Sequence, residues 1–254
     1  MKKLKLKKWV IFIINLVLIG VFAYSVINIA IWYKDNNQNK KQKDHFVNIE
    51  EKINKTIDTP EANNLDPQEI LKELKKQNND TVAWLKVNGT NINYPVVKGK
   101  DNDYYIRHSF DKSYNKAGWI FADFRNNFDG TDKNTIVYGH NRRDGSMFWT
   151  LKDTLKSSWW NNKDNLTITF IKENVIEKYK VFSVYEVEKE DYYITTDFSG
   201  DITYTDFLNT IKSRTIHDFK QDVTENDQIL TLSTCSNDNR YRTVLHAVKI
   251  NTQE

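Results

Sequence analysis

The sequence predicts a mainly β fold in which eight short strands form a closed barrel, preceded by amino-terminal helices and interrupted by one long helix before the penultimate strand. Three observations lead to this prediction. Eight separate segments are rich in apolar, β-branched and aromatic residues and are bounded by turn residues. The 254 residues include 13 Tyr, 13 Phe and 7 Trp, which favour strands. Only 8 Gly and 3 Pro occur, which excludes collagen-like and linker-dominated architectures.

The first element is a basic segment followed by an apolar one. Residues 1–8 contain five lysines, and residues 9–33 contain only three clearly polar side chains. At about 1.5 Å per residue, these 25 residues would extend roughly 37 Å, which is enough to cross a bilayer. We therefore expect a transmembrane anchor at 9–33, and we favour it over a cleaved signal peptide because no convincing cleavage site follows Ala30.

The charge distribution predicts the orientation of this anchor. The five lysines should remain cytoplasmic, which places residues 34–254 outside the cell. Without those five charges, the formal net charge of +3 becomes −2. A nucleic-acid partner needs a clustered basic face, so this composition argues against one.

Two helical segments should follow the anchor. Residues 34–64 form a polar extracellular stalk that becomes an amphipathic helix, with Phe46, Ile49, Ile53 and Ile57 at helical spacing. A second helix begins at Asp66, where Asp66, Pro67 and Glu69 form a capping box, and ends near Asn78. We expect the main folded domain to occupy residues 65–254.

The remaining segments build the barrel. The expected strands cover residues 82–88, 92–97, 118–122, 134–139, 166–170, 175–187, 228–234 and 243–250. The first two are joined by an Asn88-Gly89 turn. Residues 203–217 carry Tyr204, Phe207, Leu208 and Ile211 on one helical face behind a Thr203 cap, which predicts the long helix.

A single cysteine, Cys235, stands at the end of the predicted strand Thr231-Leu232-Ser233-Thr234-Cys235. It cannot form an intrachain disulfide, and outside the cell an unpaired thiol is open to oxidation. The two interpretations are a small buried side chain and a reactive nucleophile. A zinc site is disfavoured because the sequence has no CxxC or HxxxH spacing.

Two basic groups can accompany this thiol. If the strands around Cys235 form a hairpin, Arg242 lies opposite it, where a guanidinium favours a thiolate and can donate to an oxyanion. Arg240 is close enough to be a rival. His140 follows the strand Thr135-Ile136-Val137-Tyr138-Gly139 and has the open position that a proton-transfer group needs. His246, inside the last strand, is the second choice.

These segments resemble one protein family. Residues 231–235 with Arg242-Thr243-Val244-Leu245-His246-Ala247 closely resemble the catalytic end of class B sortases, and Arg242 is aligned because Ala247 then falls at the family's spacing. Residues 134–141 and 144–148 resemble the family's histidine strand and the turn after it. Asn93-Tyr94-Pro95-Val96-Val97 and residues 118–123 are similar to its early strands.

The resemblance implies a membrane-anchored cysteine transpeptidase with a sortase-like barrel, which joins secreted proteins to the cell wall of a Gram-positive bacterium. Cys235 would attack the carbonyl after the Thr of a carboxy-terminal sorting motif of the NPxTx or a related type. His140 would protonate the leaving amine and later activate an amine of peptidoglycan or of a lipid-linked wall precursor. Arg242 would bind the oxyanion, and Ser233 would support substrate binding. No metal or organic cofactor is implied.

Two other functions remain open from the residues. An extracellular cysteine protease or a different wall transpeptidase would use the same nucleophile, although the order of Cys and His is the reverse of papain's. A non-enzymatic wall-binding module would leave Cys235 inert and buried. The exact motif, the cargo proteins, the amine acceptor and the oligomeric state are not encoded in any pattern that we identify.

Overall fold

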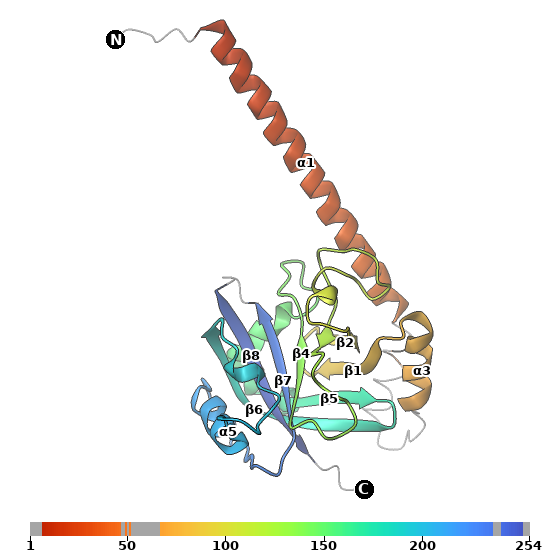
Figure 1. The fold of residues 1–254 in the computed structure, drawn as a ribbon, viewed down its shortest axis with the longest axis vertical. Coiled ribbons are helices and arrows are strands. Elements are labelled where there is room, and N and C mark those ends of the chain that lie inside the picture. Colours follow the sequence, from red (N-terminus) through yellow and green to blue (C-terminus); the bar gives the residue numbers. More distant parts are fainter. Residues whose placement is uncertain (1–6, 47–48, 50, 52–66, 236–239, 251–254) are drawn as a thin grey trace, which may run out of the picture.

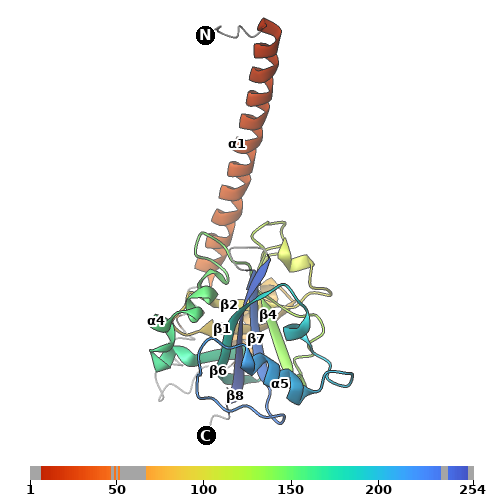
Figure 2. The ribbon, with the colours of Figure 1, turned by 90° about the vertical axis from the view of Figure 1, so that its left-hand side faces the viewer.

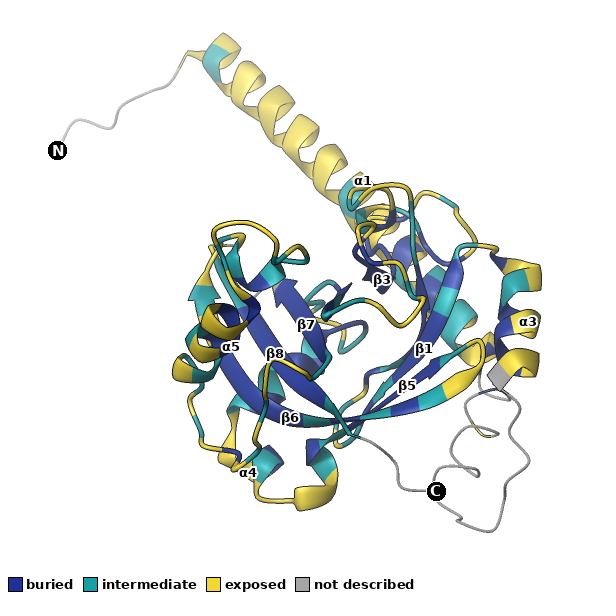
Figure 3. Ribbon diagram, turned by 60° about the horizontal axis from the view of Figure 1, so that its bottom comes forward, coloured by how far each residue is buried: buried dark blue, intermediate teal, exposed yellow. Residues whose placement is uncertain are grey.

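A computed structural model of the chain describes residues 7–46, 49, 51, 67–235 and 240–250. It consists of one long amino-terminal helix, α1 (Lys8–His45), and a β-barrel body at the helix's carboxyl end (Figure 1). Among the described residues, α1 is the one helix that is long and apolar enough to cross a membrane. Its apolar part is exposed, and buried positions appear only where α1 reaches the barrel (Figure 3).

The helix does not end with the apolar segment at Tyr33. It continues through the first part of the expected stalk as one element of 38 residues, about 57 Å long. No Pro or Gly interrupts residues 34–45, and Asp35 and Asn39 are buried against the barrel. Phe46 and Ile49 belong to the barrel's core, whereas the expected helical positions Ile53 and Ile57 lie outside the described residues. The first part of the expected stalk, residues 34–46, is therefore part of the folded body.

A short helix leads into the barrel. This helix, α3 (Pro67–Gln77), begins at the predicted Pro67 and ends one residue before Asn78. Asp66, the expected cap, lies outside the described residues. The side-chain amide of Asn78 donates to the Tyr105 hydroxyl and to the Phe110 carbonyl. Asn78 thus joins the end of the helix to the loop that contains these two residues.

The eight predicted strands are present and form a closed barrel. Their order around the barrel is β1-β2-β3-β4-β7-β8-β6-β5. Six neighbouring pairs are antiparallel, and the β2–β3 and β4–β7 pairs are parallel. Their bounds are β1 (Thr81–Val87), β2 (Asn93–Val97), β3 (Phe121–Ala122), β4 (Asn134–Tyr138), β5 (Thr167–Lys172), β6 (Val175–Glu188), β7 (Ile229–Cys235) and β8 (Tyr241–Ile250).

One strand is shorter than predicted. Only two residues of the expected strand at 118–122 form β3. The Trp119 amide instead donates to the Tyr105 carbonyl, so pairing with β2 begins only at the Ile120 carbonyl, which accepts from the Val97 amide. Gly118 has a φ of +60°, a left-handed conformation that turns the chain into the barrel.

The helix between β6 and β7 is also shorter than predicted. It is α5 (Tyr204–Ser213), and its predicted cap is confirmed because the Thr203 hydroxyl accepts from the Asp206 amide. The helix lies against the outside of β6 (Figure 2). It stops before 217 because Thr215 and Ile216 instead bond the backbone of Val184.

Two apolar clusters stabilise this arrangement. The larger one fills the barrel and includes Trp84, Trp119 and Phe170. The smaller one joins α5 to the outer faces of β6 and β8 and includes Phe207 and Tyr185. A second short helix, α4 (Ser157–Trp160), packs Trp159 at the end of the barrel near the Asn88-Gly89 turn.

Candidate active site

The predicted hairpin of β7 and β8 is present, and its register pairs Cys235 with Arg242. Cys235 is the last residue of β7 and Arg242 is the second residue of β8, so both lie at the loop end of the hairpin; residues 236–239 lie outside the described part. The side chain of Cys235 also lies outside it. Cα atoms of paired antiparallel residues are about 4.5 to 5.5 Å apart, so the backbone brings these two positions together.

The histidine strand lies on the other side of β7. The parallel pairing of β4 with β7 places Tyr138 beside Ser233, and the Gly139 amide extends the ladder by donating to the Ser233 carbonyl at 3.2 Å. Continuing this register by two residues beyond the Tyr138–Ser233 pair brings His140 level with Cys235. The end of β4 and the β7–β8 hairpin, which are far apart in the sequence, therefore meet at one rim of the barrel.

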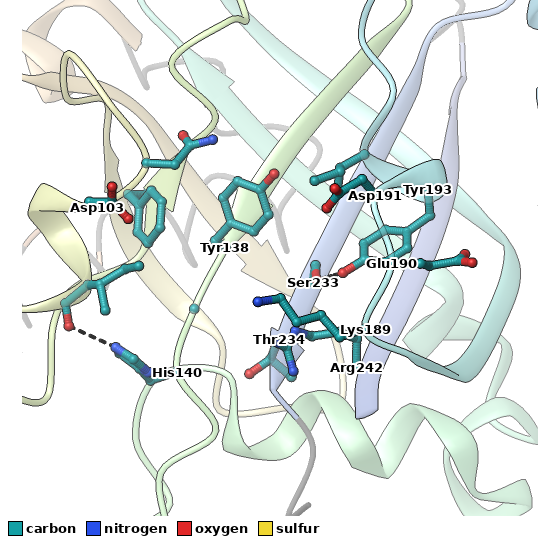
Figure 4. A pocket seen from close by; sticks show the side chains of 15 residues that line it. Asp103, Tyr138, His140, Lys189, Glu190, Asp191, Tyr193, Ser233, Thr234 and Arg242 are labelled. Atoms are coloured by element: carbon teal, nitrogen blue, oxygen red, sulfur yellow. Dashed lines mark hydrogen bonds between the residues drawn. The ribbon is translucent and has the colours of Figure 1, made fainter. Parts of the chain in front are cut away.

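The His140 ring is held by a backbone carbonyl. Its Nε2 atom lies 2.8 Å from the Ile106 carbonyl oxygen, which can only accept a hydrogen bond (Figure 4). Nε2 therefore carries the proton, and in the neutral ring Nδ1 is the basic nitrogen. The free lone pair for proton transfer is on Nδ1.

Two glycines allow this placement. A Cβ atom on Gly118 would lie 2.7 Å from the Ile106 carbonyl oxygen and 2.9 Å from the ring of His140. A Cβ atom on Gly139 would lie 2.6 Å from Phe148. Gly118 thus leaves room for the imidazole itself, and Gly139 leaves room for the Phe148 ring beside the preceding residue.

Burial lowers the pKa of His140, the hydrogen bond to the Ile106 carbonyl partly opposes this effect, and the positive charge of Arg142 adds to the lowering. The neutral imidazole is therefore favoured in this environment. A negative group beside the ring would favour the imidazolium instead.

A pocket of about 430 Å³ opens beside these residues. His140 stands on one side of it, and Thr234 and Arg242 stand on the other, with Tyr138 between them (Figure 4). Its remaining walls come from the loop before β3 and the segment after β6. The other lining residues are Asn102, Asp103, Ile106, Phe121, Gly139, Lys189, Glu190, Asp191, Tyr193, Ile194 and Ser233.

The structure separates the two arginines. Arg242 lines the pocket and is half-buried, with its guanidinium donating to the Tyr241 carbonyl at 2.8 Å. Arg240 is exposed, and its guanidinium lies over the Tyr241 ring. Arg242 is thus the arginine that the fold places at the pocket.

Ser233 lies in the pocket wall but is only 3% exposed. Its hydroxyl is 3.0 Å from the hydroxyl of Tyr193, a residue that no sequence pattern singles out. Ser233, the predicted substrate-binding residue, therefore shares this part of the pocket wall with Tyr193.

Sequence reasoning missed a hydrogen-bond network that is centred on the buried Asp123 and includes the pocket-lining Tyr138. The Tyr138 hydroxyl donates to Asp123, which also accepts two hydrogen bonds from the Arg125 guanidinium. Burial alone would raise the pKa of Asp123, but these hydrogen bonds outweigh it and hold the carboxyl group ionised. No sequence motif links these three residues, although the resembling segments 118–123 and 134–141 contain Asp123 and Tyr138.

The second-choice histidine is not at the site. His246 is fully buried between the Tyr185 and Thr231 hydroxyls, at 2.9 and 2.8 Å, and burial lowers its pKa to about 3. It is a neutral core residue. His45, His108 and His217 also lie away from the pocket lining. Among the described residues, no group of three His, Cys, Asp or Glu side chains could hold a metal ion.

Comparison with known proteins identifies the family. The sortase domain matches residues 85–250. Sortase B of Listeria monocytogenes is 36% identical over 242 residues, which cover 94% of each chain. The structure of a Staphylococcus aureus sortase B–substrate complex superposes with a TM-score of 0.74 at 32% identity, covering 85% of this chain and 99% of that one. A sortase B complexed with triglycine gives a TM-score of 0.73 at 33% identity, covering 85% and 100%.

The closed barrel, the match to the sortase domain and the similarity to sortase B together define a cysteine transpeptidase of the sortase type. The chain belongs to the sortase family, and its similarity places it in class B.

Proposed function

We propose that Cys235, His140 and Arg242 are the catalytic residues of this transpeptidase. In this proposal, it cleaves a carboxy-terminal NPxTx-like sorting motif after Thr and transfers the acyl group to a cell-wall amine. The observation that carries the assignment is the register around β7, which pairs Cys235 with Arg242 and continues to His140 through the Gly139–Ser233 hydrogen bond.

In the first half of the reaction, the Cys235 thiolate forms a bond to the scissile carbonyl carbon, and the carbonyl oxygen becomes an oxyanion. Arg242 donates hydrogen bonds to this oxygen. The C–N bond then breaks, and the departing amine takes a proton from Nδ1 of the His140 imidazolium. A thioester remains on the enzyme.

In the second half, an amine of peptidoglycan or of a lipid-linked wall precursor attacks the thioester carbonyl. Nδ1 of neutral His140 accepts the proton that this nitrogen loses. The carbon–sulfur bond breaks, and the thiolate leaves. One peptide bond is exchanged for another, and the enzyme returns to its starting state.

The electrostatics of the site support this pair of roles. Burial favours neutral His140 in the free enzyme, whereas the Cys235 thiolate beside it would stabilise the imidazolium. Arg242 adds positive charge on the other side of the pocket, which favours the thiolate.

The pocket supports an extended peptide as the acyl donor. Tyr193, Tyr138 and Ile194 supply apolar walls, and backbone and side-chain polar groups lie at the rim. The relatives provide further support, because sortase B structures are known with a substrate and with triglycine, an amine-bearing peptide. We infer that the donor and the amine acceptor of this chain belong to the same chemical classes.

We also propose that α1 anchors the chain in the cell membrane, with residues 1–8 in the cytoplasm and the barrel outside. The exposed apolar part of α1 and the lysines that precede it support this topology. Both a translocating substrate and a lipid-linked amine arrive at this membrane face, and tethering raises their effective concentration.

The test uses the full chain in lipid nanodiscs, a panel of sorting peptides including NPxTx sequences, and triglycine as the amine. Mass spectrometry should detect the peptide joined to triglycine after Thr, and Cys235→Ala should form no such product. Cleavage to the free acid alone, with triglycine in excess, would instead indicate a protease. No cleavage, together with a Cys235 thiol that resists alkylation at neutral pH, would indicate a binding module.

A further inference from the structure

The polar end of α1 is packed into the catalytic body. Asp35 and Asn39, one helical turn apart, are 6% and 5% exposed, although the apolar residues before them are open. Asn36 and Gln38 are half-buried, whereas Asn37 between them is exposed. One face of this turn therefore serves as a contact surface.

Asn115 receives that surface. Its side chain is fully buried, and its Nδ2 atom donates to the Asn39 side chain at 2.9 Å and to the Asp35 carbonyl at 3.2 Å. The neighbouring Lys116 amide donates to the Asp35 carboxylate at 3.2 Å. The helix thus binds the 115–116 segment through both backbone and side-chain atoms.

The same segment carries the partner of His140. The Asn115 amide donates to the Arg107 carbonyl at 2.8 Å, and the Asn115 carbonyl accepts from the Gly118 amide at 2.9 Å. Ile106, next to Arg107, supplies the carbonyl that binds His140, and Gly118 lies against the His140 ring. Asn115 therefore connects α1 both to the 106–107 segment, which holds the His140 ring, and to Gly118, which lies against that ring.

A second contact reaches His140 from its other side. The Arg142 guanidinium binds the Asn36 side chain and forms an ion pair with Asp144. Arg142 lies two residues after His140, in a turn that is closed by the hydrogen bond from the Phe148 amide to the His140 carbonyl at 3.0 Å. The helix therefore touches both backbone segments that fix the imidazole.

We propose that the polar carboxyl-terminal part of α1, which follows the apolar segment, positions the proton-transfer histidine, His140. Asp35, Asn36 and Asn39 are the positioning residues. This inference rests on the proposed role of His140. Asn39 is six residues beyond Tyr33, so the contact lies roughly 9 Å along the helix from the end of the apolar segment. Since α1 is continuous between these points, anchoring and the geometry of the site depend on one rigid element.

The experiment compares Asn39→Ala with Asn37→Ala in the full chain in nanodiscs. The two substitutions make the same chemical change on the same turn, but only Asn39 contacts Asn115. Steady-state ligation gives kcat and KM over a range of pH. NMR titration of the histidine rings, with the His140 signal assigned from His140→Ala, reports its pKa without any turnover.

For Asn39→Ala we expect a loss of about tenfold or more in kcat with little change in KM, because small misplacements of a catalytic group are costly. We also expect the His140 pKa to rise toward its ordinary value as water reaches the ring. Asn36→Ala should act in the same direction, and Asn37→Ala should match the wild type in both measurements.

Two outcomes would overturn the proposal. In one, Asn39→Ala and Asn36→Ala behave like Asn37→Ala. In the other, they lower the melting temperature and activity but leave the His140 titration unchanged, which would show a merely structural contact. If the wild type performs no ligation, the proposed function fails, and the NMR titration still decides whether α1 holds this ring.

Discussion

The replacement of Arg242 by Ala gives the sharpest test of the oxyanion site. In this structure, Arg242 is paired with Cys235 and lines the pocket. Removal of one oxyanion donor typically lowers kcat by about 10² to 10³. Because Arg242 is half-buried and water can partly replace it, we expect the lower end, about 100-fold, which corresponds to about 2.7 kcal/mol of transition-state stabilisation.

The assay is ligation of a sorting peptide to triglycine by the full chain, with kcat and KM measured separately. The matched control is Arg240→Ala, which removes the same side chain from an exposed position two residues away. Arg242→Lys tests the geometry, because an ammonium keeps the charge but loses the planar fork of donors. We expect it to recover only part of the lost activity.

A larger loss for Arg240→Ala than for Arg242→Ala would refute the assignment and would mean that the register of β7 and β8 does not locate the oxyanion donor. Equal activity of Arg242→Ala and the wild type would refute the charge-stabilisation argument itself. Circular dichroism and thermal unfolding of all three variants should show an intact barrel.

Three further predictions concern the site and its support. Cys235→Ala and His140→Ala should each abolish ligation while retaining the fold, as measured by product formation and circular dichroism. Gly118→Ala should destabilise the barrel more than Gly130→Ala in urea unfolding. Both glycines have a positive φ, but of the two only Gly118 has neighbouring atoms within 4 Å of where a Cβ would lie. Equal losses in the free energy of unfolding would show that the contact with His140 is not tight. The pKa of His246 is lowered to about 3, so between pH 6.5 and pH 3 only the unfolded state binds a proton at this residue. The free energy of unfolding should therefore fall by about 2 kcal/mol from pH 7 to pH 5. His246→Gln should show a smaller fall in the same urea titration.

The strands were predictable because each has a local signal. Alternating and β-branched runs located β5 through β8 to within one or two residues, and the Asn88-Gly89 turn joined the first hairpin. Thr203 marked the start of α5 through its cap. These features depend on residues close together in the sequence, which is why periodicity and turn chemistry detect them.

The differences all arise from contacts between distant segments. The polar residues after Tyr33 predicted a stalk, but Asn115 and Arg142 bind that turn to the body. The first part of the strand expected at 118–122 does not join the sheet because the Trp119 amide bonds the Tyr105 carbonyl. Such partners leave no periodic signal, so local propensity could not reveal them.

In the candidate site too, local features could be predicted from the sequence, whereas contacts between distant segments could not. The pairing of Cys235 with Arg242 follows from one hairpin, which the turn length predicts. The main group that holds His140, the Ile106 carbonyl, is a backbone atom, and any residue at that position supplies it. Tyr193 reaches Ser233 from a segment 40 residues away. Side-chain chemistry can be proposed from sequence, whereas the groups that orient it require the fold.

The parallel pairing of β4 with β7 explains why this barrel can hold such a site. Side-by-side parallel strands place their carboxyl ends at the same rim, so residues that follow the two strands become neighbours. Cys235 ends β7, and His140 follows β4 by two residues. The antiparallel return of β8 then brings Arg242 to the same level. An all-antiparallel barrel would place the carboxyl ends of adjacent strands at opposite rims, so the parallel pair is the feature that brings together the proposed nucleophile and the proposed proton-transfer group.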